Sequence, residues 1–156
     1  MKKKTPAQEC EEIRKKCVTI AKHIARLVVG EKCEHCGRTK AQGWQMHGAH
    51  IYPEGVYKGM SADIDNILCL CAQCHTGGFW KNSNKKSWHE DPMYFADWFR
   101  EKYPERAKLL KERSLTTISL YKQFWEEKLE KLKGIEKMLL KIQKEKNVTR
   151  DERDGI

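Results

Sequence analysis

The sequence predicts a small α+β protein in which a compact region of short strands lies between helical segments. Three observations support this prediction. Apolar residues recur every three or four positions near both ends of the chain, which is the spacing of one helix face. Between residues 31 and 90 this spacing is lost and glycines become frequent. The same central stretch holds two C-x-x-C pairs and most of the histidines.

Length and charge narrow the classes of function. The chain has 156 residues, which suits one compact domain with extensions. Its 31 Lys and Arg residues outnumber 22 Asp and Glu residues, and the formal net charge is +9. Such a surplus favours a polyanionic partner, with nucleic acid ahead of an anionic membrane.

The distribution of apolar residues along the chain predicts a location in the cytosol. No apolar run approaches the roughly 20 residues that a membrane span needs, so no membrane partner is expected. No apolar segment follows the charged start at residues 1–4, so we expect no signal peptide and a reducing cytosol. In that compartment the seven cysteines are expected to bind metal or stay reduced, because disulfides are rare there.

Residues 1–30 form the predicted N-terminal helical segment. One helix is expected over residues 5–29, with Thr5 as N-cap, Pro6 in the first turn and Gly30 at the end. Its apolar face is spaced by steps of three and four and consists of Cys10, Ile13, Cys17, Ile20, Ile24 and Leu27. The two cysteines on this face are therefore predicted to be core residues.

Residues 31–90 form the predicted central domain of short strands and loops, with a short helix after Cys71. Its C-x-x-C pairs are Cys33 with Cys36 and Cys71 with Cys74. Four thiolates make a closed tetrahedral site for structural zinc, which we predict here. The alternatives are four free thiols or a redox dithiol, and the redox reading lacks the βαβ context it needs. Cys69 lies in an apolar run and is expected to be a buried strand residue.

Residues 91–147 form the predicted C-terminal helical region. Asp91 and Pro92 are expected to begin a first helix, Pro104 a second, and a longer third helix is expected from about residue 115 to 146. The approximate heptad spacing of the third helix has two interpretations. It packs on its own domain, or it forms the coiled-coil arm of a homodimer. Residues 148–156 are predicted to be a flexible tail.

The central domain also carries an ordered set of polar residues. Met46-His47-Gly48-Ala49-His50 is followed by Asn66, and His75 comes directly after the second C-x-x-C pair. This order and spacing resemble the HNH endonucleases. The resemblance covers roughly residues 33–75 and implies a ββα-metal core stapled by zinc at the two C-x-x-C pairs. A narrower resemblance, carried by His-Gly-Ala-His and the following elements, is to phage NinG-like recombination proteins.

The HNH resemblance implies a role for each residue. His50 would be the general base, since a neutral imidazole accepts a proton from water near pH 7. His75 would hold one divalent cation, Mg²⁺ or a softer ion, and Asn66 would tie down the loop that orients His50. Many HNH enzymes place Asp or His directly before the base, where this chain has Ala49. His47 is the predicted substitute. His89 is a third metal ligand, a phosphate contact or a surface residue.

Basic and aromatic residues alternate after His75. Lys81, Lys85 and Lys86 lie among three aromatic residues at positions 79, 80 and 88. Lysines that hold phosphates give salt-dependent DNA binding without base-specific readout, which is our prediction for these three. In the alternative interpretation the aromatic residues close the small core and the lysines only face water.

These observations together predict a metal-dependent endonuclease that hydrolyses DNA phosphodiester bonds. The NinG-like resemblance implies recombination or DNA processing by a phage in the cytosol of a bacterial host. The alternative is a catalytically inactive zinc-finger DNA-binding protein on the same scaffold. Ala49 favours that alternative, whereas the joint presence of His50, Asn66 and His75 favours the enzyme.

Overall fold

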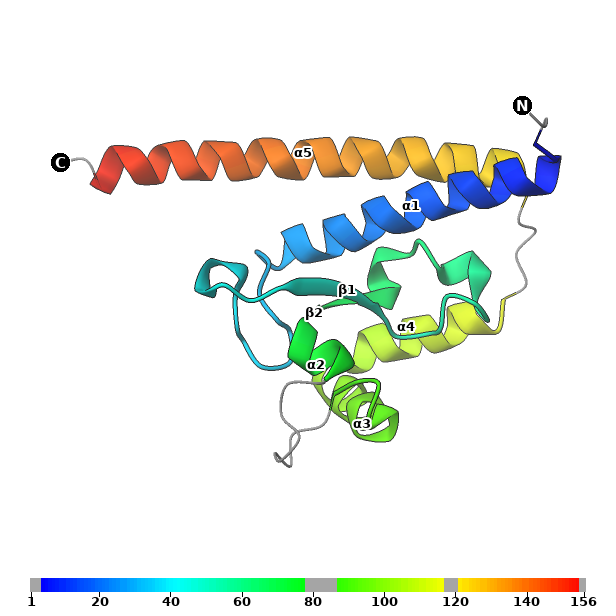
Figure 1. The fold of residues 1–156 in the computed structure, drawn as a ribbon, viewed down its shortest axis with the longest axis horizontal. Coiled ribbons are helices and arrows are strands. Elements are labelled where there is room, and N and C mark those ends of the chain that lie inside the picture. Colours follow the sequence, from blue (N-terminus) through cyan, green and yellow to red (C-terminus); the bar gives the residue numbers. More distant parts are fainter. Residues whose placement is uncertain (1–3, 78–86, 117–120, 155–156) are drawn as a thin grey trace.

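The computed structural model describes residues 4–77, 87–116 and 121–154, with side chains as far as residue 146. It is an α+β protein, as predicted, in which a two-stranded sheet and a short helix lie among four longer helices (Figure 1). The helices and strands in chain order are α1 (Pro6–Val28), β1 (Met46–His50), β2 (Ile67–Cys71), α2 (Ala72–Thr76), α3 (Pro92–Lys102), α4 (Pro104–Ser114) and α5 (Lys122–Asp154).

Helix α1 begins where the capping residues predict. The Thr5 side chain accepts a hydrogen bond from the backbone N–H of Gln8, and the Gln8 side chain accepts one from the backbone N–H of Thr5. This reciprocal capping box satisfies two of the donors that a helix start leaves unpaired. Cys17 and Ile24 on the predicted apolar face are fully buried. Cys17 is therefore a core residue, as expected, and Cys10 is half-buried.

The sheet has two antiparallel strands. Their register pairs Met46 with Cys71 and His50 with Ile67. Every residue of β2 is buried, including Cys69 as predicted, and α2 follows this strand without a loop. The two strands and α2 therefore form a ββα unit.

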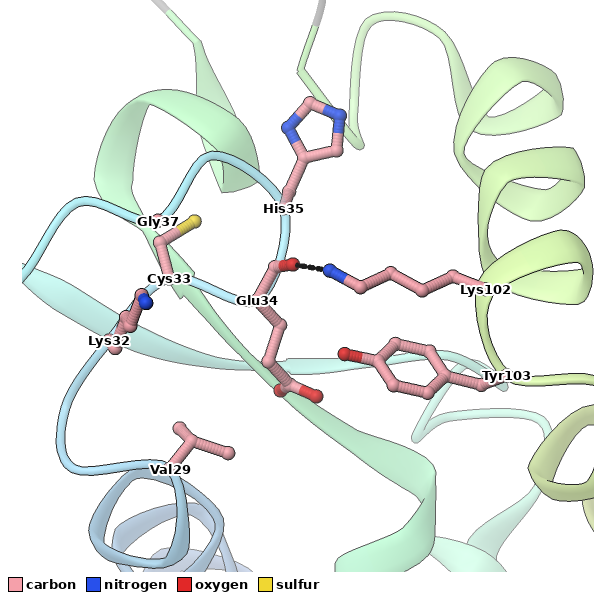
Figure 2. Close-up of a pocket in the computed structure, with 8 residues that line it drawn as sticks. All are labelled: Val29, Lys32, Cys33, Glu34, His35, Gly37, Lys102 and Tyr103. Atoms are coloured by element: carbon pink, nitrogen blue, oxygen red, sulfur yellow. Dashed lines mark hydrogen bonds between the residues drawn. The ribbon is translucent and has the colours of Figure 1, made fainter.

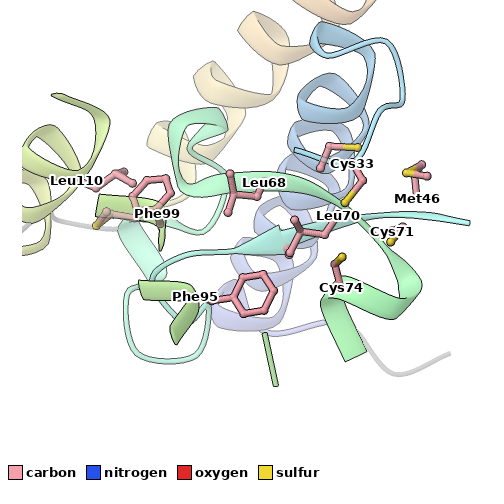
Figure 3. Close-up of a cluster of buried hydrophobic side chains, with 12 residues drawn as sticks. Cys33, Met46, Leu68, Leu70, Cys71, Cys74, Phe95, Phe99 and Leu110 are labelled. Atoms are coloured by element: carbon pink, nitrogen blue, oxygen red, sulfur yellow. The ribbon is translucent and has the colours of Figure 1, made fainter. Parts of the chain in front are cut away.

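The sheet lies between two hydrophobic clusters. Leu68 and Leu70 of β2 pack with Phe95, Phe99 and Leu110 of α3 and α4 (Figure 3). On the other side, Ile67 joins a cluster that α1 and α5 provide. Ile67 at the start of β2 thus belongs to one cluster, whereas Leu68 to Cys71 belong to the other.

Helices α3 and α4 begin at the predicted prolines. The Asp91 carboxylate accepts a hydrogen bond of 3.1 Å from the backbone N–H of Tyr94, and Pro92 follows this N-cap. Pro104 opens α4. Both starts were readable from the sequence because a capping Asp and a first-turn proline are local signals.

Helix α5 runs alongside α1 in the same direction (Figure 1). Lys122 contacts Glu9 at 2.8 Å, and His23 contacts Glu136 at 2.5 Å. Trp125 of α5 is buried in the cluster shared with α1. This is one of the two interpretations that the sequence left open, and it accounts for the first part of α5, whereas Ile135 and Ile142 farther along are exposed.

The bounds of α5 differ from those expected. The helix begins at Lys122 rather than near residue 115, and it continues to Asp154. Most of the predicted flexible tail, 148–156, is therefore helical. The reason is local, because residues 147–154 contain no glycine or proline to stop a helix. Across the part of the chain that the structure describes, no helix is long and apolar enough to cross a membrane.

Candidate functional site

The four cysteines of the two C-x-x-C pairs come together in one cluster. All four Sγ atoms lie within 4.8 Å of one another, and those of Cys36 and Cys71 are 3.7 Å apart. Four sulfurs around one tetrahedral zinc ion lie about 3.8 Å apart, as a Zn–S bond of about 2.3 Å dictates. Cys33, Cys71 and Cys74 are buried, whereas Cys36 is exposed. The cluster, Cys33, Cys36, Cys71 and Cys74, therefore fits a structural zinc ion.

The pKa values of the clustered cysteines are also consistent with a site for a cation. A hydrogen bond from the Cys74 thiol lowers the pKa of Cys33 to about 4 and raises the pKa of Cys74. The thiols thus share protons, because several thiolates cannot ionise side by side in a buried site unless a cation is present. A zinc ion deprotonates its thiol ligands and removes this conflict.

His35 supports the cysteine cluster from inside the first pair. Its Nδ1 lies 3.3 Å from Cys74 Sγ, and its ring packs on Phe95 at 4.5 Å between centroids. Burial lowers the pKa of His35, so the neutral ring has one N–H to donate to the sulfur. Figure 2 shows the same turn held from α3, where Lys102 donates to the backbone oxygen of Glu34. Zinc ligands are often fixed by such donors, a role that spacing alone did not indicate for His35.

A second centre lies at a cavity of about 410 Å³ beside the sheet. Its histidines come from three segments that are distant in sequence: His50 from β1, His75 from α2 and His89 from the turn before α3. The residues that line the cavity are Lys22, Gly48, His50, Pro53, His75, Trp88, His89 and Pro92. The predicted base, His50, and the predicted metal ligand, His75, thus line the same cavity.

His50 is held in one tautomer. Its Nε2 lies 2.7 Å from the backbone oxygen of Ser61. A carbonyl only accepts hydrogen bonds, so Nε2 carries the proton and the lone pair is on Nδ1. The Nδ1 atom is 3.8 Å from a carboxylate oxygen of Glu54. Burial lowers the pKa of His50, and the hydrogen bond to Ser61 opposes this only in part. The ring is therefore neutral at pH 7 and has a free basic nitrogen.

Asn66 is fully buried beneath the loop that joins the two strands. Its Nδ2 donates to the backbone oxygens of Tyr52 and Met60, both at 3.1 Å. Its Oδ1 accepts from the backbone N–H of Tyr52 at 2.8 Å. The side chain thus ties the start of the loop, at Tyr52, and its interior, at Met60, to the residue that precedes β2. Since Ser61 follows Met60 directly, Asn66 also positions the carbonyl that anchors His50.

His47 and His75 meet at their ring nitrogens. The two Nδ1 atoms are 3.0 Å apart, close to the separation of about 3.3 Å that two imidazoles show on one tetrahedral zinc ion. Burial, and next the charge of His89, lower the pKa of His75 to about 4, so this ring is neutral and able to bind metal. Alternation along β1 places His47 on the same face as Ala49. His47 can therefore supply a ligand from the face where Ala49 has none.

His89 lies beside His75 through backbone pairing. The N–H of His89 donates to the oxygen of His75 at 3.2 Å, and the N–H of Trp88 donates to the oxygen of Cys74 at 2.8 Å. The rings of His75 and His89 are 4.8 Å apart between centroids. This pairing holds His89 at the cavity, whereas the sequence had left open a surface position.

Five further charged residues bear on the site: three lysines predicted to contact phosphate, and two neighbours of His50 that the sequence did not indicate. Lys81, Lys85 and Lys86 lie outside the described residues, so their DNA contacts stay predictions. Lys22 and Glu54 were not singled out, yet both lie beside His50. An acidic residue four positions after the base could have drawn attention to Glu54. Lys22 gave no sequence signal, since a lysine off the apolar face of a helix is ordinary.

Residues 33–77 match the family model of the HNH endonucleases. This segment is an HNH domain. The match includes both C-x-x-C pairs, β1, β2 and α2, so the HNH domain consists of the ββα unit and its cysteine cluster. No curated protein and no solved structure matches the chain. The narrower resemblance to NinG-like proteins has no match of its own and stays a prediction.

Proposed function

We propose that this protein is a metal-dependent endonuclease that hydrolyses DNA phosphodiester bonds. The observation that carries the proposal is that His50 is neutral and held in one tautomer. Its N–H is anchored on the Ser61 carbonyl, and its neutral ring borders the cavity that also contains His75. The HNH domain supports a nucleic-acid-related function, and the net charge of +9 favours a polyanionic substrate. By the NinG-like resemblance, we place this activity in DNA processing such as phage recombination inside a bacterial host.

His50 would accept the proton of the attacking water at Nδ1. The Ser61 carbonyl keeps the ring in place and stabilises the imidazolium that forms, because it accepts the hydrogen bond in both states. The Glu54 carboxylate, 3.8 Å from Nδ1, adds favourable charge to the protonated ring. Asn66 is a positioning residue, since it fixes the loop that carries the Ser61 carbonyl.

His75 and His47 are the residues that would hold the divalent ion, with His89 as a third ligand. A bound ion would supply Lewis acidity at the phosphate and charge neutralisation at the leaving oxygen. All three donors are imidazoles, which suit zinc, nickel, copper and iron, whereas Mg²⁺ prefers oxygen ligands. We therefore favour a transition-metal ion over Mg²⁺ at these histidines. The cysteine cluster would keep its own structural zinc.

One observation favours the alternative of an inactive DNA-binding module. Ala49 is 1% exposed and packs in the core, so its position gives the site no ligand. An ion held by too few protein ligands would be lost, and binding without cleavage would remain. The proposed function thus depends on whether His47 supplies the missing ligand.

A plasmid-nicking assay separates the two functions. Wild-type protein is incubated with supercoiled DNA and Mg²⁺, Mn²⁺ or Ni²⁺, beside His50→Ala with its zinc content verified. His23→Ala is the matched control, because His23 pairs with Glu136 between α1 and α5. We expect cutting by wild type and His23→Ala, loss of cutting with EDTA, and no cutting by His50→Ala. Failure of wild type to cut plasmid or branched junctions, with DNA binding retained, would support the inactive module.

A further inference from the structure

Lys22 carries a positive charge from α1 to the cavity of the HNH domain. It lies outside the matched segment 33–77, yet it lines the same cavity as His50, His75 and His89. Its side chain is 36% exposed, and its Cβ and Cγ atoms lie next to Gly48 of β1. Among the described residues that line this cavity, Lys22 is the one with a permanent positive charge.

Gly48 of β1 allows α1 to approach this closely. A Cβ atom at position 48 would lie 2.7 Å from Cβ and Cγ of Lys22 and 3.0 Å from its Cα. Real Cβ atoms essentially never come within 2.7 Å of another carbon, and the Lys22 Cβ moves only with its backbone, so any larger residue would push the helix away from the strand. The glycine, which stands two residues before the predicted base, thus sets where Lys22 lies.

The three basic residues on this side of α1 differ in the partners that their side-chain N–H groups find within the protein. Arg14 is buried and is bound by Glu11, Glu54 and Ser61. Arg26 donates to the backbone oxygen of Met46 at 3.2 Å. The Lys22 ammonium has its nearest described anionic partner, a Glu54 oxygen, at 3.8 Å, which is beyond hydrogen-bond length. Its three N–H donors are therefore available to a ligand in a way that those of Arg14 are not.

We propose that Lys22 binds a non-bridging oxygen of the phosphate that the HNH domain cleaves. This inference rests on the proposed nuclease function. The phosphate gains negative charge as water attacks, so a fixed ammonium stabilises the transition state more than the bound substrate. In the free protein, one carboxylate oxygen of Glu54 lies 3.8 Å from both Lys22 Nζ and His50 Nδ1. Glu54 thus holds Lys22 near the cavity. The N-terminal helix is thus part of the active site as well as a support for the HNH domain.

The competing explanation is that Lys22 only neutralises the charge of Glu54. A double substitution distinguishes this explanation from a phosphate contact. Lys22→Gln, Lys22→Arg, Glu54→Gln and Lys22→Gln/Glu54→Gln are compared with wild type for kcat, KM, melting temperature and zinc content. Lys137→Gln is the charge-matched control, because this residue is exposed on α5, which α1 separates from the strands (Figure 1). Binding of a duplex oligonucleotide is measured in EDTA over a range of salt concentrations.

We expect Lys22→Gln to lower kcat/KM about 10- to 100-fold, the effect of losing one hydrogen bond to a charged group. Its melting temperature should stay unchanged, Lys22→Arg should keep most of the activity, and Lys137→Gln should match wild type. The double variant should be at least as slow as Lys22→Gln, because it also loses the Glu54 charge beside His50. Recovery of activity in the double variant would overturn the proposal, as would wild-type kinetics in Lys22→Gln.

Failure of the proposed function gives a different result. If wild type does not cut DNA at all, the nuclease proposal is wrong, and the phosphate contact is judged on binding. Loss of one phosphate contact lowers the slope of log affinity against log salt by about 0.9 for duplex DNA. An unchanged slope in Lys22→Gln then overturns the contact as well, and the lower slope supports it.

Discussion

Replacing Asn66 by alanine should destabilise the protein by about 3 kcal/mol. The substitution removes one acceptor and two donors that the side chain offers to the backbone of Tyr52 and Met60. Each such bond contributes about 1 kcal/mol net, and a buried group left without a partner costs about 1–3 kcal/mol. Asn66 is fully buried, whereas Tyr52 is half-buried and partly open to water. We therefore use about 1 kcal/mol for each bond, and the sum is a lower bound because Met60, unlike Tyr52, is buried.

The prediction is measured by urea and thermal unfolding of zinc-saturated protein. For a chain of this length, about 3 kcal/mol corresponds to a melting temperature roughly 6–12 °C lower. Gln123→Ala is the matched control, because its amide makes one exposed hydrogen bond to Glu127 at 3.0 Å. It should change stability by less than about 0.5 kcal/mol. A loss below about 1 kcal/mol in Asn66→Ala would refute the view that this amide holds the loop.

Four further predictions concern the cysteine cluster, the helix contact and the catalytic base. Cys71→Ser should lose the zinc and lower the melting temperature, which elemental analysis and circular dichroism would show; retention of one zinc per chain would contradict this. His35→Ala should keep the zinc but weaken its binding about 10-fold in a chelator competition, because the cluster loses an N–H donor. Gly48→Ala should destabilise the protein by about 1–3 kcal/mol through its clash with α1, whereas Gly55→Ala, which meets no atom within 4 Å, should be near neutral in the same urea titration. Burial lowers the pKa of His50, and the neutral ring is the base. With the metal site kept saturated, kcat/KM should therefore fall only below the ordinary histidine pKa of about 6.5, and a limb above that value would contradict the prediction.

The sequence by itself determined the helices and the identity of the central domain. Pro6, Pro92 and Pro104 open helices because their effect on the backbone is local. Two C-x-x-C pairs predicted one metal site because four thiolates form a closed tetrahedral site for zinc. The order of His50, Asn66 and His75 indicated the HNH domain, and the family match confirms it. These signals depend on short spacings that a sequence shows directly.

Only the tertiary structure decided which distant groups share the cavity and how each is held. The tautomer of His50 follows from the Ser61 carbonyl, and the place of Lys22 follows from the missing side chain at Gly48. The apolar spacing of α5 was equally suited to its own domain or to a second chain, and the structure shows that Trp125 and Leu132 pack in the cluster shared with α1. Periodicity shows which face of a helix is apolar but not what covers that face, because the covering partner lies far away in sequence.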